Sequence, residues 1–218
     1  MKLILVSGKA NSGKDHVSNK LSEYITKNFY TGYSNYKAKP IRMSLAEPVK
    51  QIARDVFGWN GEKDDKGRRL LINIGTWVGK DFGSKFIAGE DIIYLGCKEE
   101  NISDIYKKFT RYFKPSVNLW SGILKDKILY TKEEKPVENI FVVSDNRFED
   151  EIVYLQTIFG DDVIPIRVKE NQRTKYIDDI SETDLDKYDK FDFIIDNSIE
   201  ENDKHLFKQF DKIFKGKL

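Results

Sequence analysis

The sequence predicts a three-layer α/β domain with a mainly parallel sheet and helices on both of its faces. Residues 3–6 and 140–143 are continuously apolar and rich in β-branched or aromatic side chains, which is typical of strands buried on both faces. Amphipathic segments with helical spacing separate these two strands and three shorter ones. The length of 218 residues suits one core, so we predict a single domain over residues 1–218.

In the first half of the chain, each amphipathic segment is bounded by turn signals. A helix is expected after the first strand, and a short strand is expected over residues 41–45. A second helix begins near Pro48, which a first helical turn tolerates, and ends at Gly58. A charged loop over 61–67 then precedes a third helix. The apolar positions that define these helices are Val17, Leu21 and Ile25, then Val49, Ile52, Ala53, Val56 and Phe57, then Leu70, Leu71, Ile74, Trp77 and Val78.

The second half begins with an irregular stretch, from which we interpret about 89–117 as an insertion. A helix follows from Leu119, and a solvated link covers 133–136. Pro165 lacks an N–H, so the strand expected over 163–168 should lie toward a sheet edge or carry a bulge. The other elements are a strand at 191–195 and helices with apolar positions Trp120, Ile123, Leu124 and Ile128, then Ile152, Val153, Leu155 and Phe159, then Leu206, Phe210, Ile213 and Phe214.

The composition limits the classes of function. The 37 basic and 36 acidic residues leave a net charge of +1, which argues against a protein that coats nucleic acid. Cys97 is the only cysteine, so an internal disulfide is excluded and a reducing compartment is favoured. The first apolar run is too short for a signal peptide or a membrane span. We therefore expect a soluble, cytoplasmic protein without a membrane partner.

The segment between the first strand and the first helix has the spacing G-x-x-x-x-G-K. Such a loop points backbone N–H groups at a phosphate, while the helix dipole and a lysine add positive charge. The alternative is a glycine-bearing turn with an exposed lysine, but the flanking strand and helix favour a nucleotide-phosphate site. Asp15 stands where Ser or Thr is usual. The candidate residues for nucleotide binding are Gly8, Asn11, Ser12, Gly13, Lys14, Asp15 and His16.

Other polar segments also follow expected strands, and parallel strands bring their carboxyl ends to one crevice. Asp145 resembles the position that holds the magnesium of a nucleoside triphosphate, although it could instead bind the second substrate or cap a helix. The Arg147 guanidinium could hold a phosphate through two hydrogen bonds. The helix that contains Lys50 begins at a strand end, so we expect Lys50 to point toward the crevice. The segments that converge are 7–15, 44–50, 145–147 and 196–197.

The polar segment 169–190 is flanked by Arg167 and contains Arg173. In small phosphotransferases such a segment can fold over the triphosphate and deliver an arginine to the transition state. A plain charged loop is the alternative. His16 and His205 have no carboxylate partners at ligand spacing, so they do not predict a metal site.

Five motifs in order resemble those of the deoxynucleoside monophosphate kinases of tailed bacteriophages, within the wider nucleoside monophosphate kinase group. The resemblance covers nearly the whole chain except about 89–115. The motifs are Gly8-x-x-x-x-Gly13–Lys14–Asp15; residues 44–50 (SLAEPVK); Arg68–Arg69–Leu70–Leu71 with Gly75–Thr76 and Gly79–Lys80; residues 144–148 (SDNRF) with Glu151; and Ser181–Glu182 with Asp192 and Asn197.

The resemblance implies a P-loop kinase fold with an acceptor-binding region at about 40–88 and a small lid at about 169–190. It also implies transfer of the γ-phosphoryl group of ATP to a deoxynucleoside 5′-monophosphate, with Mg²⁺, in the cytoplasm of a host cell if the chain is viral. A homodimer is common among relatives, and the oligomeric state stays open. The implied residues are Lys14, Asp145, Arg147 and Arg173 for catalysis; Arg167 with the loop for ATP; Asp15 and Asp145 for the metal; and Ser44, Lys50, Arg68, Arg69, Lys80, Trp120, Asp145, Arg147 and Glu151 for the acceptor.

The chain also departs from the pattern of that family. His16 replaces the usual Thr, so positions 15 and 16 both lack a hydroxyl. Ile72 replaces Gln, Lys80 replaces Arg, and Ile180 stands where His is common. Two alternatives therefore stay open: a P-loop kinase for another small acceptor, such as dephospho-coenzyme A or a phosphorylated polyol, and a protein that binds a nucleotide without phosphotransfer.

Overall fold

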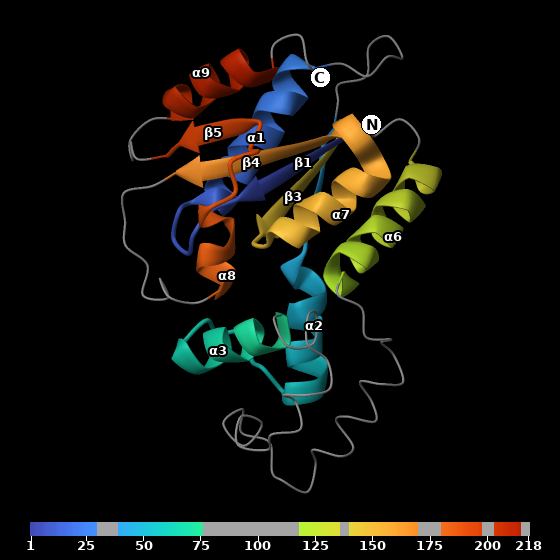
Figure 1. Cartoon of the computed structure of the whole chain (residues 1–218), viewed down its shortest axis with the longest axis vertical. Coiled ribbons are helices and arrows are strands. Elements are labelled where there is room, and N and C mark those ends of the chain that lie inside the picture. The colour runs from blue at the N-terminus through green and yellow to red at the C-terminus, as the bar shows by residue number, and fades with distance from the viewer. Residues whose placement is uncertain (30–38, 76–117, 136–139, 170–179, 198–202, 215–218) are drawn as a thin grey trace, which may run out of the picture. The chain divides into compact units, whose positions relative to one another are not determined.

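The computed structural model describes residues 1–29, 39–75, 118–135, 140–169, 180–197 and 203–214 (Figure 1). They belong to two compact units. The larger unit comprises Met1–Leu45 and Ile123–Leu218, and the smaller one comprises Ala46–Gly122. The single domain expected from the sequence stays a prediction. Within the described ranges, no helix combines the length and the apolar character that crossing a membrane requires.

The larger unit is built on a parallel sheet of five strands, in the order β2-β3-β1-β4-β5. This confirms the predicted α/β fold with a mainly parallel sheet. The two apolar runs found in the sequence form the central strand β1 and its neighbour β3, where burial on both faces is greatest. The strands are β1 Lys2–Ser7, β2 Ile41–Ser44, β3 Ile140–Asn146, β4 Val163–Lys169 and β5 Phe193–Asp196.

Helices cover both faces of the sheet (Figure 1). On one face α1 and α9 pack together, and their apolar stripes form a continuous core with β1, β3, β4 and β5. On the other face lies α7, with the turns of α6 from Ile123 onward beside it. Shorter helical turns follow β4, so part of the expected lid segment is helical. The bounds are α1 Lys14–Asn28, α6 Leu119–Glu134, α7 Glu149–Phe159, η3 Gly160–Asp162, α8 Ile180–Thr183, η4 Asp184–Asp186 and α9 Asp203–Phe214.

Pro165 predicts that its strand lies toward a sheet edge or carries a bulge. β4 lies next to the outer strand β5, and its register with β1 is unbroken, so the first of the two alternatives agrees with the topology. The Pro165 carbonyl accepts a hydrogen bond from the Asp192 N–H at 3.0 Å, so this residue faces β5. Pairing between β4 and β5 begins one residue later, at Ile166 opposite Phe193. The missing N–H therefore costs the ladder no hydrogen bond, because it lies just before β5 begins.

The far side of β5 carries a side-chain contact from α9. The Gln209 amide donates to the Asp196 carbonyl at 2.9 Å and accepts from the Asp196 N–H at 2.8 Å. Both backbone groups of that residue are thus paired by one side chain. This contact ties the last helix to the end of the last strand.

The smaller unit contains α2 Ala46–Phe57 and α3 Asp65–Asn73. The charged loop expected over 61–67 ends earlier than predicted, because the Asp64 side chain caps α3 by accepting from the Gly67 N–H at 2.7 Å. The Trp120 indole N–H donates to the Gly75 carbonyl at 2.8 Å within the same unit. The insertion at about 89–117, like Trp77, Val78 and Lys80, falls outside the described residues.

Some expected boundaries also shift in the larger unit. Residues 144–146 continue β3 beyond the apolar run, and α6 runs to Glu134, into the expected link. α7 ends at Phe159, next to the predicted stop at Gly160, which has a φ of 58°. α9 contains the four apolar positions predicted for the last helix. Apolar periodicity locates helices well, whereas polar residues at the ends of elements leave the boundaries ambiguous.

We expect Phe210→Ala to lower the free energy of unfolding by about 3–5 kcal/mol, the usual cost of removing a buried aromatic ring. Phe210 is fully buried in α9 and its ring centroid lies 5.5 Å from that of Tyr24. Urea unfolding followed by circular dichroism measures the change. The control is Ile194→Ala on β5, where the side chain is 61% exposed and a change below about 0.5 kcal/mol is expected.

Candidate phosphate-binding site

The loop between β1 and α1 folds into a tight, internally bonded turn. The Ser12 N–H donates to the Lys9 carbonyl at 3.1 Å, and the Val17 N–H donates to the Gly13 carbonyl at 2.9 Å to begin α1. Asn11 and Gly13 have φ values of 63° and 76°. Glycine adopts this conformation without strain and Asn tolerates it better than most residues do. The sequence therefore supplies suitable residues at both positions where the loop reverses.

The two glycines of the loop also permit close approaches. A Cβ at Gly8 would lie 2.4 Å from Ser12 Oγ, and a Cβ at Gly13 would lie 2.2 Å from Asn197 Nδ2. The Asn197 amide donates to the Ser12 carbonyl at 2.9 Å, and the Asn197 N–H donates to the Lys169 carbonyl at 3.1 Å. Asn197 thus ties the loop to the carboxyl ends of β4 and β5.

Lys14 lies at the start of α1 and is 7% exposed. Its ammonium donates to the Lys9 carbonyl at 3.3 Å, across the loop. Burial lowers the pKa of Lys14, and the charge of Arg147 lowers it further, while the carboxylates of Asp145, Glu182 and Asp15 act in the opposite direction. A buried ammonium is thereby surrounded by one guanidinium and three carboxylates.

Asp145 lies in β3 with a φ of 70°, a conformation that is uncommon outside glycine, although Asp and Asn adopt it more often than other residues. Its carboxylate accepts a hydrogen bond from the Ser44 hydroxyl, at the end of β2, at 2.7 Å. The residue that precedes α7 is Phe148, so the alternative that Asp145 caps this helix is wrong. Backbone strain of this kind tends to occur at functional sites, which fits the interpretation of Asp145 as a ligand.

Glu151 caps the amino end of α7 from inside the protein. Its Oε2 accepts from the backbone N–H groups of Arg147 at 2.9 Å and Phe148 at 3.2 Å, and from the Asn146 amide at 2.8 Å. Burial raises the pKa of Glu151 to about 7, although these three hydrogen bonds favour the ionised form. The structure gives this side chain a role in holding the 146–148 turn. Its predicted role in acceptor binding stays a prediction.

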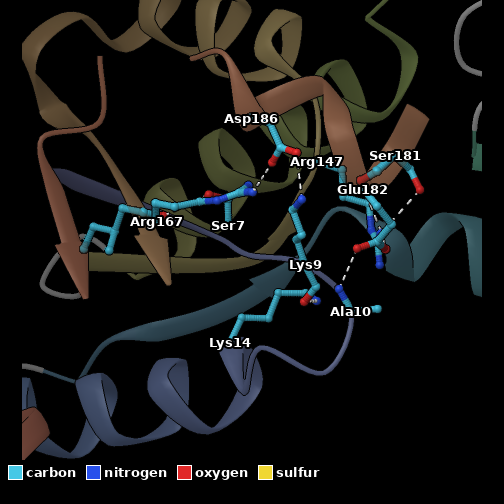
Figure 2. A network of polar contacts seen from close by, with 10 residues as sticks. Ser7, Lys9, Ala10, Lys14, Arg147, Arg167, Ser181, Glu182 and Asp186 are labelled. Carbon is cyan, nitrogen blue, oxygen red and sulfur yellow. Dashed lines mark hydrogen bonds and ion pairs between the residues drawn. The ribbon is translucent and has the colours of Figure 1, made fainter. Parts of the chain in front are cut away.

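Arg147 points at the segment formed by α8 and η4 (Figure 2). Its Nη1 forms an ion pair with Glu182 Oε1 and lies 3.4 Å from both the carbonyl and the hydroxyl oxygen of Ser181. The other carboxylate oxygen of Glu182 accepts from the Ala10 N–H of the loop at 2.5 Å. One buried carboxylate thus joins the loop to the arginine that follows β3.

A second acidic residue of the same segment binds two further cations beside the loop. Asp186 pairs with Lys9 Nζ at 2.7 Å and with Arg167 Nη2 at 2.9 Å, as Figure 2 shows. Arg167 also lies over the Phe191 ring, 5.9 Å from its centroid. Burial lowers the pKa of Arg167, and the charge of Asp186 opposes this shift.

Two further predicted residues, Asp15 and His16, lie on the exposed side of the first turn of α1. His16 is exposed on α1, and its Nε2 lies 3.2 Å from Asp203 Oδ1. Asp15 is exposed in the first turn of the same helix. Arg173 falls outside the described residues. Among the residues that the structure describes, no group of three or more His, Cys, Asp or Glu side chains could hold a metal ion.

In the smaller unit, Lys50 Nζ lies 3.9 Å from Glu47 Oε2, and Arg68 Nε donates to the Lys63 carbonyl at 2.9 Å. Arg69 is exposed and Trp120 is buried. Their predicted roles in acceptor binding are therefore not decided by these contacts and stay predictions.

Four residues of the network received no role from the sequence: Lys9, Glu182, Asp186 and Asn197. Glu182 and Asn197 belong to the fifth motif, so a signal was present without a chemical interpretation. Asp186 looked like one of many acidic residues in a polar segment. Burial separates Glu182 from the acidic residues Asp184 and Asp186 of the same segment, and the sequence pattern around it is too polar to reveal this.

Comparisons with known proteins add little to this description. No protein-family model matches the chain, and no curated protein matches its sequence. The structure is similar to a crystal structure of an unliganded sugar kinase from Janibacter sp. HTCC2649, with a TM-score of 0.39 and 10% identity, over 99% of this chain and 95% of that chain. Values this low define neither a reaction nor a substrate.

We expect Gly13→Ala to destabilise the protein more than Gly58→Ala does. The two glycines have φ values of 76° and 66°, so both substitutions carry a backbone cost of about 1–2 kcal/mol. A Cβ at position 58 meets nothing within 4 Å, whereas one at position 13 would displace Asn197 from its hydrogen bond with the loop. Urea unfolding of the two variants measures the difference. Equal losses of stability would contradict the tie between the loop and Asn197.

A second prediction concerns pH. Because the folded-state pKa of Glu151 is about 7, above its ordinary value of 4.5, the stabilising effect of its protonation is complete below pH 4.5 and is lost as the pH rises through 7. Relative to Glu151→Gln, the wild type should lose about 3 kcal/mol of unfolding free energy over this range. Urea unfolding at several pH values tests this. Glu149→Gln alters an exposed acid in the same turn. Its unfolding free energy should change with pH in the same way as that of the wild type.

Proposed function

We propose that this protein is a nucleotide-dependent phosphotransferase that passes the γ-phosphoryl group of ATP to a deoxynucleoside 5′-monophosphate. The observation that carries the proposal is the loop Gly8–Lys14 at the carboxyl end of the central strand, with the buried ammonium of Lys14 crossing it. Loop N–H groups, a helix amino end and a lysine together form a site for the phosphates of a nucleotide.

The groups around Lys14 suit phosphoryl transfer, which needs positioning and charge stabilisation more than covalent chemistry. In the proposed reaction an oxygen of the acceptor phosphate attacks the γ-phosphorus. The bond from that phosphorus to the β–γ bridging oxygen breaks, and ADP leaves with the electron pair. Lys14 and Arg147 would bind the charge that develops on the transferred group, and Arg167 is a further cation beside the loop.

Mg²⁺ commonly binds through one or two carboxylates together with substrate phosphates and water. Asp145 fits this donor set, because its carboxylate is held by Ser44 and acts on the charge of Lys14. Asp15 offers a second carboxylate at the start of α1. When bound, the cation would neutralise charge on the phosphates. These two residues would hold it.

The choice of acceptor rests on the five motifs that resemble those of phage deoxynucleoside monophosphate kinases. A kinase for another small phosphorylated acceptor would use the same donor site. A protein that binds a nucleotide without turnover is the other alternative, and the missing hydroxyl at Asp15 and His16 favours it. A single set of assays separates the three.

We expect the purified chain, with ATP and Mg²⁺, to form a diphosphate from at least one of dAMP, dCMP, dGMP and dTMP, with AMP tested beside them. Lys14→Met should lower kcat by at least about 100-fold, because a cation at the transferred phosphate is lost. The control is Lys20→Met on the same helix, where the ammonium binds Asp203 at 2.9 Å. Chromatography of the nucleotides measures the products.

The assays also give results that would contradict the proposal. Equal activity of the Lys14 variant and the wild type would show that the loop takes no part in the reaction. Phosphorylation of a hydroxyl of dephospho-coenzyme A or of a phosphorylated polyol, with no diphosphate from any nucleoside monophosphate, would show that the acceptor is a different one. ATP binding without turnover on any acceptor would favour a protein that binds a nucleotide without phosphotransfer.

A further inference from the structure

The loop proposed for phosphates already has an anion beside it in this structure. The Glu182 side chain is 3% exposed, and its two carboxylate oxygens have different partners. One oxygen accepts from the Ala10 N–H of the loop at 2.5 Å, and the other pairs with the Arg147 guanidinium (Figure 2). A loop N–H and a guanidinium are the two kinds of donor that bind a phosphate at such sites.

A carboxylate and a phosphate cannot both take these donors. Each donor hydrogen that Glu182 holds is unavailable to the phosphate, and two anions this close in a buried site repel one another strongly. Glu182 also acts on the charges of Lys14 and Arg167, so one carboxylate affects three cations beside the loop. A phosphate chain that takes the Ala10 N–H and Arg147 Nη1 must therefore displace Glu182 from them.

We propose that Glu182 is an internal competitor for phosphate: its carboxylate takes the place of a phosphate on Ala10 and Arg147, and a polyphosphate must displace it to bind. The inference rests on the proposed function only in that the loop must bind a phosphate. A single phosphate gains too few contacts to displace a buried ion pair. A triphosphate also reaches the other loop N–H groups and Lys14, so the competition selects for a phosphate chain.

The opposing interpretation is that Glu182 only anchors α8 to the loop. The two interpretations predict opposite signs. An anchor that is lost loosens the site and weakens phosphate binding, whereas a competitor that is lost strengthens it. Binding affinity therefore decides between them more directly than stability, which falls in both cases because Arg147 loses its partner.

The test measures binding of inorganic tripolyphosphate to the full chain by isothermal titration calorimetry without Mg²⁺. Glu182→Gln keeps the shape of the side chain and removes its charge. We expect it to bind tripolyphosphate at least about tenfold more tightly than the wild type, the scale expected for a buried charge pair. Inorganic phosphate, tested in parallel, should bind detectably only to the variant.

The matched control is Asp184→Asn, two residues further along the same segment. Asp184 accepts from the Glu149 N–H at 2.8 Å and not from the loop, so this variant makes the same change in charge away from the site. Its affinity for tripolyphosphate should stay within about twofold of the wild type, since surface charges act weakly at a distance. An equal gain in both variants would overturn the proposal in favour of a general effect of charge.

Circular dichroism checks that Glu182→Gln is folded. If it is not, Glu182→Asp decides, because its side chain is one methylene shorter and cannot span both donors. It should also bind tripolyphosphate more tightly than the wild type. Unchanged or weaker binding by the folded variant would overturn the proposal.

Other results separate this inference from the proposed function. Tripolyphosphate that binds neither the wild type nor the variant would overturn the phosphate site itself, and the inference with it. Tighter binding by the variant, together with no diphosphate product from the wild type, would support the competitor and contradict the kinase.

Discussion

The parallel pairing of β1 with β3 on one side and β4 on the other is the constraint on which the described site depends. It sets Ser7, the last residue of β1, opposite Asn146 and Arg167. The loop that leaves β1 therefore begins where β3 delivers Asp145 and Arg147. Ser7, the 145–147 segment and Arg167 are far from one another in the sequence. Their proximity follows from the register of the strands, and a shift of one residue would turn each side chain to the opposite face.

Charge balance is the second condition of this site. The buried Lys14 ammonium and the partly buried Arg147 guanidinium lie next to Asp145 and Glu182, and the opposite charges offset part of one another's desolvation cost. Glu182 and Ser181 hold the guanidinium at the end of β3. The cations at these strand ends are therefore already paired with carboxylates.

The sequence predicted the parts of the structure that depend on local pattern. The loop follows from the spacing of Gly8, Gly13 and Lys14, and the apolar runs located β1 and β3. The convergence of segments 7–15 and 196–197 was predicted from the strand ends. The individual hydrogen bonds of Glu182 and Asn197 could not be, because their loop partners lie 172 and 185 residues away and no local periodicity encodes them. Pro165 shows a related limit of local pattern: a residue type shows which backbone donor is missing, but only the topology shows whether a neighbouring strand needs it.

The contact of Gln209 with Asp196 has a consequence for how the protein behaves at high concentration. β5 is an outer strand of the described sheet, and an outer strand normally presents its N–H and C=O groups as a template for another chain. Gln209 occupies both backbone groups of Asp196, in the way that a paired strand would. The last helix thereby occupies the backbone groups that strand addition would need at the carboxyl end of β5, next to the loop between β1 and α1.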